Sequence, residues 1–150
     1  MSWLDLTSPS LQVHHKSWCA LRGSRKVPHV TDYVTYVKTV PADFSASIIA
    51  SEKRECTFKT IGENITPIFP GCIPGMPFSK IVPLPFRLSI SGLFAEVIKG
   101  REPIVRRGAH GNGEFERFYE QIILPFIDAR FDVRIILVLA DGYDFRQREQ

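Results

Sequence analysis

Cysteine is scarce in this sequence, and its placement excludes two common ways of stabilising a small domain. Only Cys19, Cys56 and Cys72 occur, and no two of them form a CxxC pair. An odd number of isolated cysteines argues against both a disulfide framework and a structural zinc site. We therefore expect the fold to depend on an ordinary hydrophobic core.

Long apolar runs are also absent. The longest, at 135–140, is far shorter than the roughly 20 residues that a membrane-spanning helix needs. The first five residues have neither the basic region nor the apolar region of a signal peptide. We therefore expect a cytoplasmic protein that does not bind membranes.

A strong excess of one charge is missing too, since 19 Lys and Arg face 16 Asp and Glu for a net charge of +3. The basic residues form two short local clusters without the interleaved aromatic residues of a single-strand binding groove. We interpret both clusters as solvated loops and helix ends, and we expect no nucleic-acid partner. The clusters are Arg22, Arg25 and Lys26, and then Arg101, Arg106 and Arg107.

Apolar residues are plentiful, at 44% of the 150 residues, and phenylalanine alone occurs 11 times. A chain of this length most often forms one domain. The composition predicts an aromatic-rich core and excludes global disorder.

Two helices are predicted from their apolar spacing and their end signals. Ser8 and Pro9 are typical of a helix start, and Gly23 ends a first helix at about 9–22. A second amphipathic helix covers 84–99 and ends at Gly100. The segment 62–85 is rich in proline and glycine, which indicates short helical turns separated by loops.

The strand pattern predicts about five strands, at 44–50, 56–61, 102–110, 115–126 and 133–140. We predict turns at 111–113 and 128–130, and we interpret Pro125 as a hinge between the last two strands. The segment 30–43 is ambiguous, because β-branched and aromatic residues abound there and Pro41 interrupts them.

This order of elements resembles the PAS fold, and in particular the bacterial family of small stand-alone PAS proteins of unknown function. The resemblance covers residues 9–145, and the order and spacing of its motifs carry it. It departs from the family pattern at 71–75, where a more polar segment is expected. The motifs are Trp18-Cys-Ala-Leu-Arg-Gly-Ser-Arg-Lys-Val-Pro28, Phe58-Lys-Thr-Ile-Gly62, Gly100-Arg-Glu-Pro103 and Ile122-Ile-Leu-Pro125.

The resemblance implies an α+β fold: a five-stranded antiparallel sheet with short helices and one longer helix on one face, plus an N-terminal helix. Residues 1–150 would form one PAS-like domain with a core at about 44–141 and a short C-terminal tail. It further implies a sensory or interaction module. Since we expect no output domain within this length, the signal would leave by contact with an unknown protein partner.

In that fold six apolar side chains would point inward and could line a ligand pocket. One alternative is a pocket for a small organic molecule in the cleft between helices and sheet. The other is solid packing with no pocket, which we favour slightly. The candidate residues are Phe58, Phe69, Phe86, Phe94, Phe118 and Ile136.

The N-terminal helix presents an apolar stripe that includes Leu11, Trp18 and Leu21. A helix that precedes a PAS core often packs against the same helix of a second copy, so we expect a homodimer through this stripe. The alternative is that the stripe folds back onto its own sheet.

No sequence signal identifies a cofactor or a reaction. A haem ligand would be expected in the 84–99 helix, which contains none of the four histidines. Cys72 lacks the neighbouring Asn and Arg of a flavin-adduct site. Neither a metal site nor a set of converging catalytic side chains is indicated, so we expect a non-enzyme. An enzyme of unrecognised type is the remaining alternative.

Overall fold

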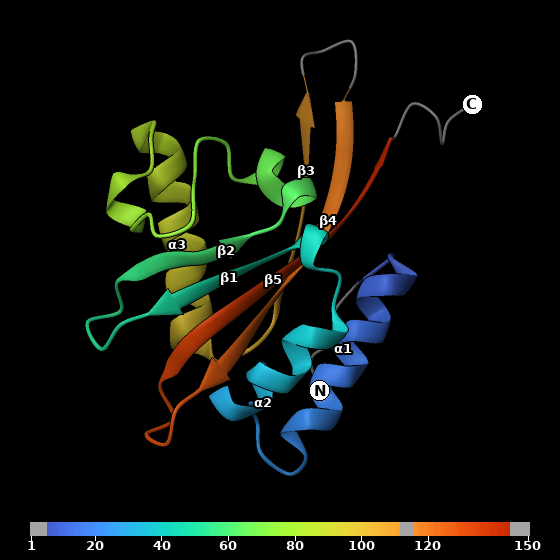
Figure 1. Cartoon of the computed structure of the whole chain (residues 1–150), viewed down its shortest axis with the longest axis vertical. Coiled ribbons are helices and arrows are strands. Elements are labelled where there is room, and N and C mark those ends of the chain that lie inside the picture. The colour runs from blue at the N-terminus through green and yellow to red at the C-terminus, as the bar shows by residue number, and fades with distance from the viewer. Residues whose placement is uncertain (1–5, 112–115, 145–150) are drawn as a thin grey trace.

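A five-stranded antiparallel sheet is the centre of this computed structural model, which describes residues 6–111 and 116–144 (Figure 1). The strand order is β2-β1-β5-β4-β3, so the first and last strands along the chain pair in the middle of the sheet. The sheet confirms the PAS-like α+β fold predicted from the sequence. The strands are β1 (Ser45–Ala50), β2 (Cys56–Ile61), β3 (Ile104–Gly111), β4 (Glu116–Ile127) and β5 (Val133–Asp144).

Helices cover both faces of this sheet. Figure 1 shows α1 and α2 against one face and α3 against the other. Short 3-10 helices connect these elements to the strands. The helices are α1 (Pro9–Arg22), α2 (Val30–Tyr36), η1 (Val37–Thr39), η2 (Ala42–Phe44), η3 (Glu63–Ile68), η4 (Phe78–Lys80) and α3 (Leu84–Gly100).

The ends of α1 are set by local sequence, as predicted. The Ser8 side chain accepts a hydrogen bond from the backbone N–H of Leu11, and Pro9 occupies the first turn. Gly23 follows the last helical residue with φ 56°, a conformation that costs glycine little. The helix therefore begins and ends at the residues that the sequence indicates.

The ambiguous segment 30–43 contains α2. His29 caps this helix, because its Nδ1 accepts from the backbone N–H of Thr31 and the Asp32 carboxylate accepts from the His29 N–H. Two buried tyrosines of α2 then fix its position. Tyr33 shares a 2.6 Å hydrogen bond with Ser47 of β1, and the Tyr36 hydroxyl donates to the carbonyl of His14 in α1 at 2.6 Å.

Pro125 lies inside β4, so the predicted hinge at this residue is wrong. Strand β3 begins at Ile104, opposite Ile123, and does not reach Pro125. Pro125 is paired with Ile136 of β5 on one side only, and its other side faces no strand, which is where a strand tolerates a residue without an N–H. Beyond it, the N–H of Ile127 donates to the carbonyl of Pro28, and the connection to β5 follows at 128–132. The other predicted turn, at 111–113, lies largely outside the described residues.

The centre of the sheet is covered on both faces. Residues 120–127 of β4 and 136–140 of β5 are buried without a break. A strand that packs on both faces needs apolar residues at successive positions, which explains the continuous Ile and Leu runs of these two strands.

Gly62 permits a close approach between two connecting segments. Its φ of −67° is available to any residue, but an added Cβ would lie 2.6 Å from the carbonyl oxygen of Asp43 and closer still to that of Ala42. The glycine therefore lets the turn before η3 pack directly against the backbone of η2.

Candidate functional site

The face of the sheet under α3 is packed with phenylalanine rings. Phe58 of β2 contacts Phe69 at a centroid distance of 5.4 Å and Phe78 at 4.9 Å, and Phe78 contacts Phe94 of α3 at 5.2 Å. All four side chains are buried. Three of them, all but Phe78, belong to the predicted pocket residues. Of those three, Phe58 and Phe69 are in direct ring contact, and Phe78 connects Phe94 to them.

The other three predicted pocket residues are more dispersed. Ile136 is fully buried and lies in register with Ile48, which is in register with Phe58, so it extends the same face. Phe86 is half-buried on α3. Phe118 is two residues from Glu120 in β4 and therefore shares its face, which is the one that α1 covers. The six residues thus occupy both faces of the sheet.

The apolar stripe of α1 folds onto its own sheet, which is the second of the two predicted arrangements. Leu11 and Trp18 are 2% and 1% exposed, and Leu21 is half-buried against the core. The indole N–H of Trp18 donates to the carbonyl of Pro125 at 3.1 Å. A dimer through this stripe would require α1 to leave the sheet.

A buried carboxylate holds the start of α1. Glu120 accepts hydrogen bonds from the N–H and hydroxyl of Thr7 and from the N–H of Ser8, and Arg107 lies 2.8 Å away. Burial acts to raise the pKa of Glu120, but these hydrogen bonds and Arg107 outweigh it and lower the pKa below 4.5. Glu120 is therefore ionised, and its carboxylate holds the start of α1 in place.

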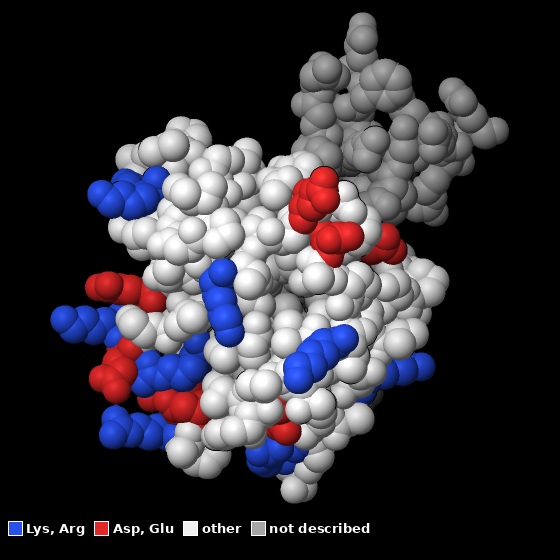
Figure 2. All heavy atoms as spheres, viewed as in Figure 1, with Lys and Arg blue, Asp and Glu red and all other residues white. Residues whose placement is uncertain are grey.

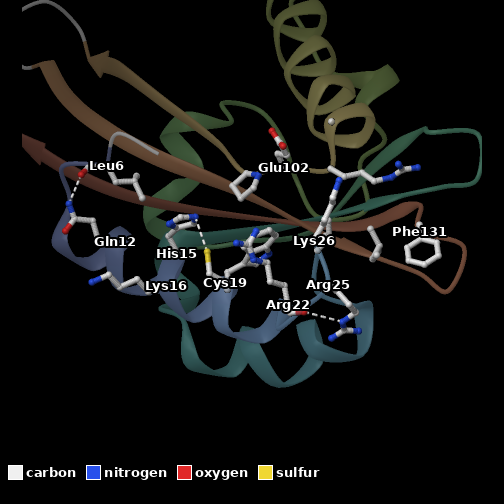
Figure 3. Close-up of a pocket in the computed structure, with 16 residues that line it drawn as sticks. Leu6, Gln12, His15, Lys16, Cys19, Arg22, Arg25, Lys26, Glu102 and Phe131 are labelled. Atoms are coloured by element: carbon white, nitrogen blue, oxygen red, sulfur yellow. Dashed lines mark hydrogen bonds between the residues drawn. The ribbon is translucent and has the colours of Figure 1, made fainter. Parts of the chain in front are cut away.

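Beside α1 lies a groove of about 1380 Å³, which we call the basic groove (Figure 3). It is bounded by α1, the loop that follows α1, the turn between α3 and β3, and the turn between β4 and β5. Its lining includes five cationic side chains and one carboxylate, Glu102. The cations are Lys16, Arg22, Arg25, Lys26 and Arg101.

The cations of the basic groove differ in how far they are already paired. Arg25 lies 3.0 Å from Asp32, whereas Arg101 lies 4.0 Å from Asp132, a weak ion pair beyond hydrogen-bonding distance. The guanidinium of Arg22 stands 5.8 Å from the centroid of the Trp18 ring. The lining of the basic groove therefore keeps positive charge that is only partly compensated and that could bind an anion.

This cationic character is local. Figure 2 shows one face of the molecule, where acidic and basic side chains are mixed at the margin beside the β1–β2 turn. The net charge of the whole chain is only +3. The groove therefore concentrates positive charge on a molecule that is nearly balanced overall, which favours binding of a localised anion.

A histidine and a cysteine face each other along the wall that α1 forms. Figure 3 shows the 3.4 Å contact between His15 Nε2 and Cys19 Sγ. Burial and the nearby Arg22 lower the pKa of His15, so its ring is mostly neutral at pH 7. The other two cysteines are buried, and burial raises the pKa of Cys56 to about 11 and also raises that of Cys72.

Two residues at the rim have unusual backbone conformations. Arg101 has φ 54° at the end of α3, and Phe131 has φ 66° in the β4–β5 turn. Left-handed conformations are uncommon for residues other than glycine, and at Arg101 the conformation ends α3. Phe131 is also 64% exposed, which leaves an aromatic ring accessible at the rim of the groove.

Four of the five groove cations, all but Lys16, fall in the two short basic clusters of the sequence, which were interpreted as separate solvated segments. Residues 22–26 and Arg101 are more than 70 positions apart, and only the fold brings them to one groove. No local signal pointed to Phe131.

The described residues supply no cluster of three or more His, Cys, Asp or Glu side chains that could hold a metal ion. Within the same residues, no helix is long and apolar enough to cross a membrane. His14 and His15 lie on α1, and His29 caps α2. The predictions about haem, flavin and catalysis stay predictions.

Several solved structures are similar to this chain, and one of them is a PAS domain. The PAS domain of BvgS from Bordetella pertussis is similar over 80% of this chain and 90% of its own length, with 12% identity and a TM-score of 0.43. No family model and no curated protein matches the chain.

Proposed function

We propose that this chain is a PAS-type sensory module that binds a small anionic ligand in the basic groove and signals by contact with another protein. The observation that carries the proposal is the composition of the groove, where five cationic side chains face one carboxylate. Preorganised cations in a concave site attract anions and orient their charged groups. We further propose that the module acts in the cytoplasm and has no catalytic activity.

The position of the groove supports a sensory role. Its cations come from α1, from the loop after α1 and from the end of α3. Since α1 and α3 pack on opposite faces of the sheet, a ligand that bridges these segments would couple the two layers. Ligand binding would then change how α1 and the end of α3 are held relative to the sheet, and a partner protein that contacts either helix could detect this change.

The test is ligand binding at constant ionic strength. We expect citrate and pyrophosphate to raise the melting temperature of the protein, while glucose and chloride do not. The double variant Arg22→Gln, Lys26→Gln should abolish this effect. Lys38→Gln with Lys53→Gln removes the same charge from exposed positions that do not line the groove, and should retain the effect. Equal losses in both double variants would show nonspecific electrostatics and contradict the proposal.

A second candidate is an interaction module without a ligand. The packed rings of Phe58, Phe69, Phe78 and Phe94 favour it, because they fill the cleft between sheet and α3. Native mass spectrometry of freshly purified protein separates the candidates. Extra mass that is lost on denaturation supports a ligand sensor, whereas a dimer without added mass, combined with no response to anions, supports the interaction module.

A further inference from the structure

We infer that the ligand of the basic groove is an aromatic polyanion of low molecular weight, of which a nucleoside polyphosphate is the simplest class. This inference rests on the proposed function and adds the chemistry of the ligand. The inference rests on two features of the groove. Its cations lie on separate segments, where several anionic groups could contact them at once, and an accessible ring at the rim could stack on a planar group.

The spacing of the cations calls for several anionic groups. Lys16 and Arg22 are six positions apart on α1, which is about 9 Å along a helix that rises 1.5 Å per residue. A ligand with several anionic groups could contact both side chains at once. Lys26 and Arg101 extend the cationic lining to two further segments. A chain of phosphates, or two separated carboxylates, would match this distribution.

The aromatic part of the ligand follows from Phe131. Trp18 is 1% exposed and is covered by Arg22 and by the ring of His15, 6.4 Å away, so it offers no free face. Phe131 is 64% exposed at the rim. Its left-handed backbone presents a large apolar ring to solvent at the edge of a cationic groove. A planar ring stacked there would remove apolar surface from water.

The size of the groove fits such a ligand. Its volume of about 1380 Å³ is above the range of roughly 300–1,000 Å³ that is usual for small-molecule sites. A nucleotide fits in this space together with bound water. A long nucleic acid would need cations along an extended track, whereas the whole chain carries 19 Lys and Arg against 16 Asp and Glu, a net charge of only +3. The small ligand is therefore favoured over an oligonucleotide.

Isothermal titration with three probes at constant ionic strength tests the inference. We expect ATP to bind about tenfold or more tightly than tripolyphosphate, since base stacking on an aromatic side chain contributes about 1–3 kcal/mol and 1.4 kcal/mol is a factor of ten. Adenosine, which lacks the charges, should show no measurable binding. A ten-residue oligothymidine that binds more tightly than ATP would overturn the inference in favour of a nucleic-acid site.

Two variants separate the parts of the ligand. Phe131→Ala should lower the affinity for ATP to that for tripolyphosphate and leave tripolyphosphate unaffected. Phe44→Ala, at a 38% exposed ring outside the groove, is the control and should change neither. If ATP and tripolyphosphate bind equally to the wild type, the aromatic part is wrong while the anion sensor stands. If neither binds, both the inference and the proposed function fail.

Cys19 provides an independent reading of where the probe binds. Its thiol is half-buried and lines the groove, whereas Cys56 and Cys72 are buried elsewhere. We expect ATP to slow the alkylation of Cys19 by iodoacetamide at least fivefold and to leave the slow reaction of the other two unchanged. ATP binding without protection of Cys19 would place the site outside the basic groove and overturn the inference.

Discussion

Replacing Trp18 with alanine tests whether α1 belongs to the core of its own chain. The side chain is 1% exposed, and its indole N–H donates to the buried carbonyl of Pro125. Truncation of a buried tryptophan costs about 3–5 kcal/mol, which includes the cavity it leaves. The carbonyl of Pro125 also loses its donor. For a domain of this size we expect the melting temperature to fall by roughly 10–15 °C.

The assay is thermal unfolding by circular dichroism, with the native mass measured on the same samples. Trp18→Phe retains most of the ring and removes the indole N–H, so a smaller loss of about 1–2 kcal/mol is expected. Val13→Ala is the control, since Val13 is 59% exposed on the same helix. We expect all three variants to have the same number of subunits as the wild type in native mass spectra. The reasoning would be refuted if Trp18→Ala kept the wild-type melting temperature but had fewer subunits. That result would place the stripe in a dimer interface.

Two further predictions concern the fold around α1 and η2. Glu120→Gln should destabilise the protein by about 1–3 kcal/mol at pH 7, because an amide cannot accept all the hydrogen bonds of the carboxylate or pair with Arg107. Because folding lowers the pKa of Glu120, the wild type should be more stable than Glu120→Gln by the full amount above pH 4.5, and this difference should disappear as the pH falls through the folded pKa. Urea unfolding of both proteins from pH 7 to 3 measures the difference. Gly62→Ala should lower the free energy of unfolding by about 1–3 kcal/mol, because the added methyl group overpacks the contact with η2. Gly92→Ala, on α3 with open space around its Cβ position, should raise it by up to about 1 kcal/mol. Urea unfolding measures both, and two variants that matched the wild type would contradict this reasoning.

The elements with clear local signals were predicted well. The bounds of α1 follow from Ser8, Pro9 and Gly23, and those of α3 from the apolar spacing that ends at Gly100. These signals act within one turn of helix, so they can be recognised without the rest of the chain. The strands β1 and β2 were also predicted to within a residue, because a polar turn separates two short apolar runs.

Two local predictions failed or stayed open for physical reasons. In α2, the β-branched and aromatic residues have weak helix propensity, and a histidine cap is a less familiar signal than Ser, Thr, Asp or Asn. The contacts of Tyr33 and Tyr36 decide the helix by burying one face of it. Pro125 was interpreted as a break because proline is unfavourable inside a strand that is paired on both sides, but at this residue β4 pairs with β5 alone, since β3 does not reach it.

The sequence by itself determined the ends of α1 and α3, the pairing of the short strands β1 and β2, the order that resembles the PAS fold and an aromatic-rich core. Each of these depends on residues that are close in the chain or on composition. Only the tertiary structure decided that the stripe of α1 covers its own sheet, that Phe118 lies on the face opposite Phe58, and that Arg101 joins the cations of α1 at one groove. Such relations join segments far apart in sequence, so they become definite only when the sheet orders its strands and the helices bury their apolar faces.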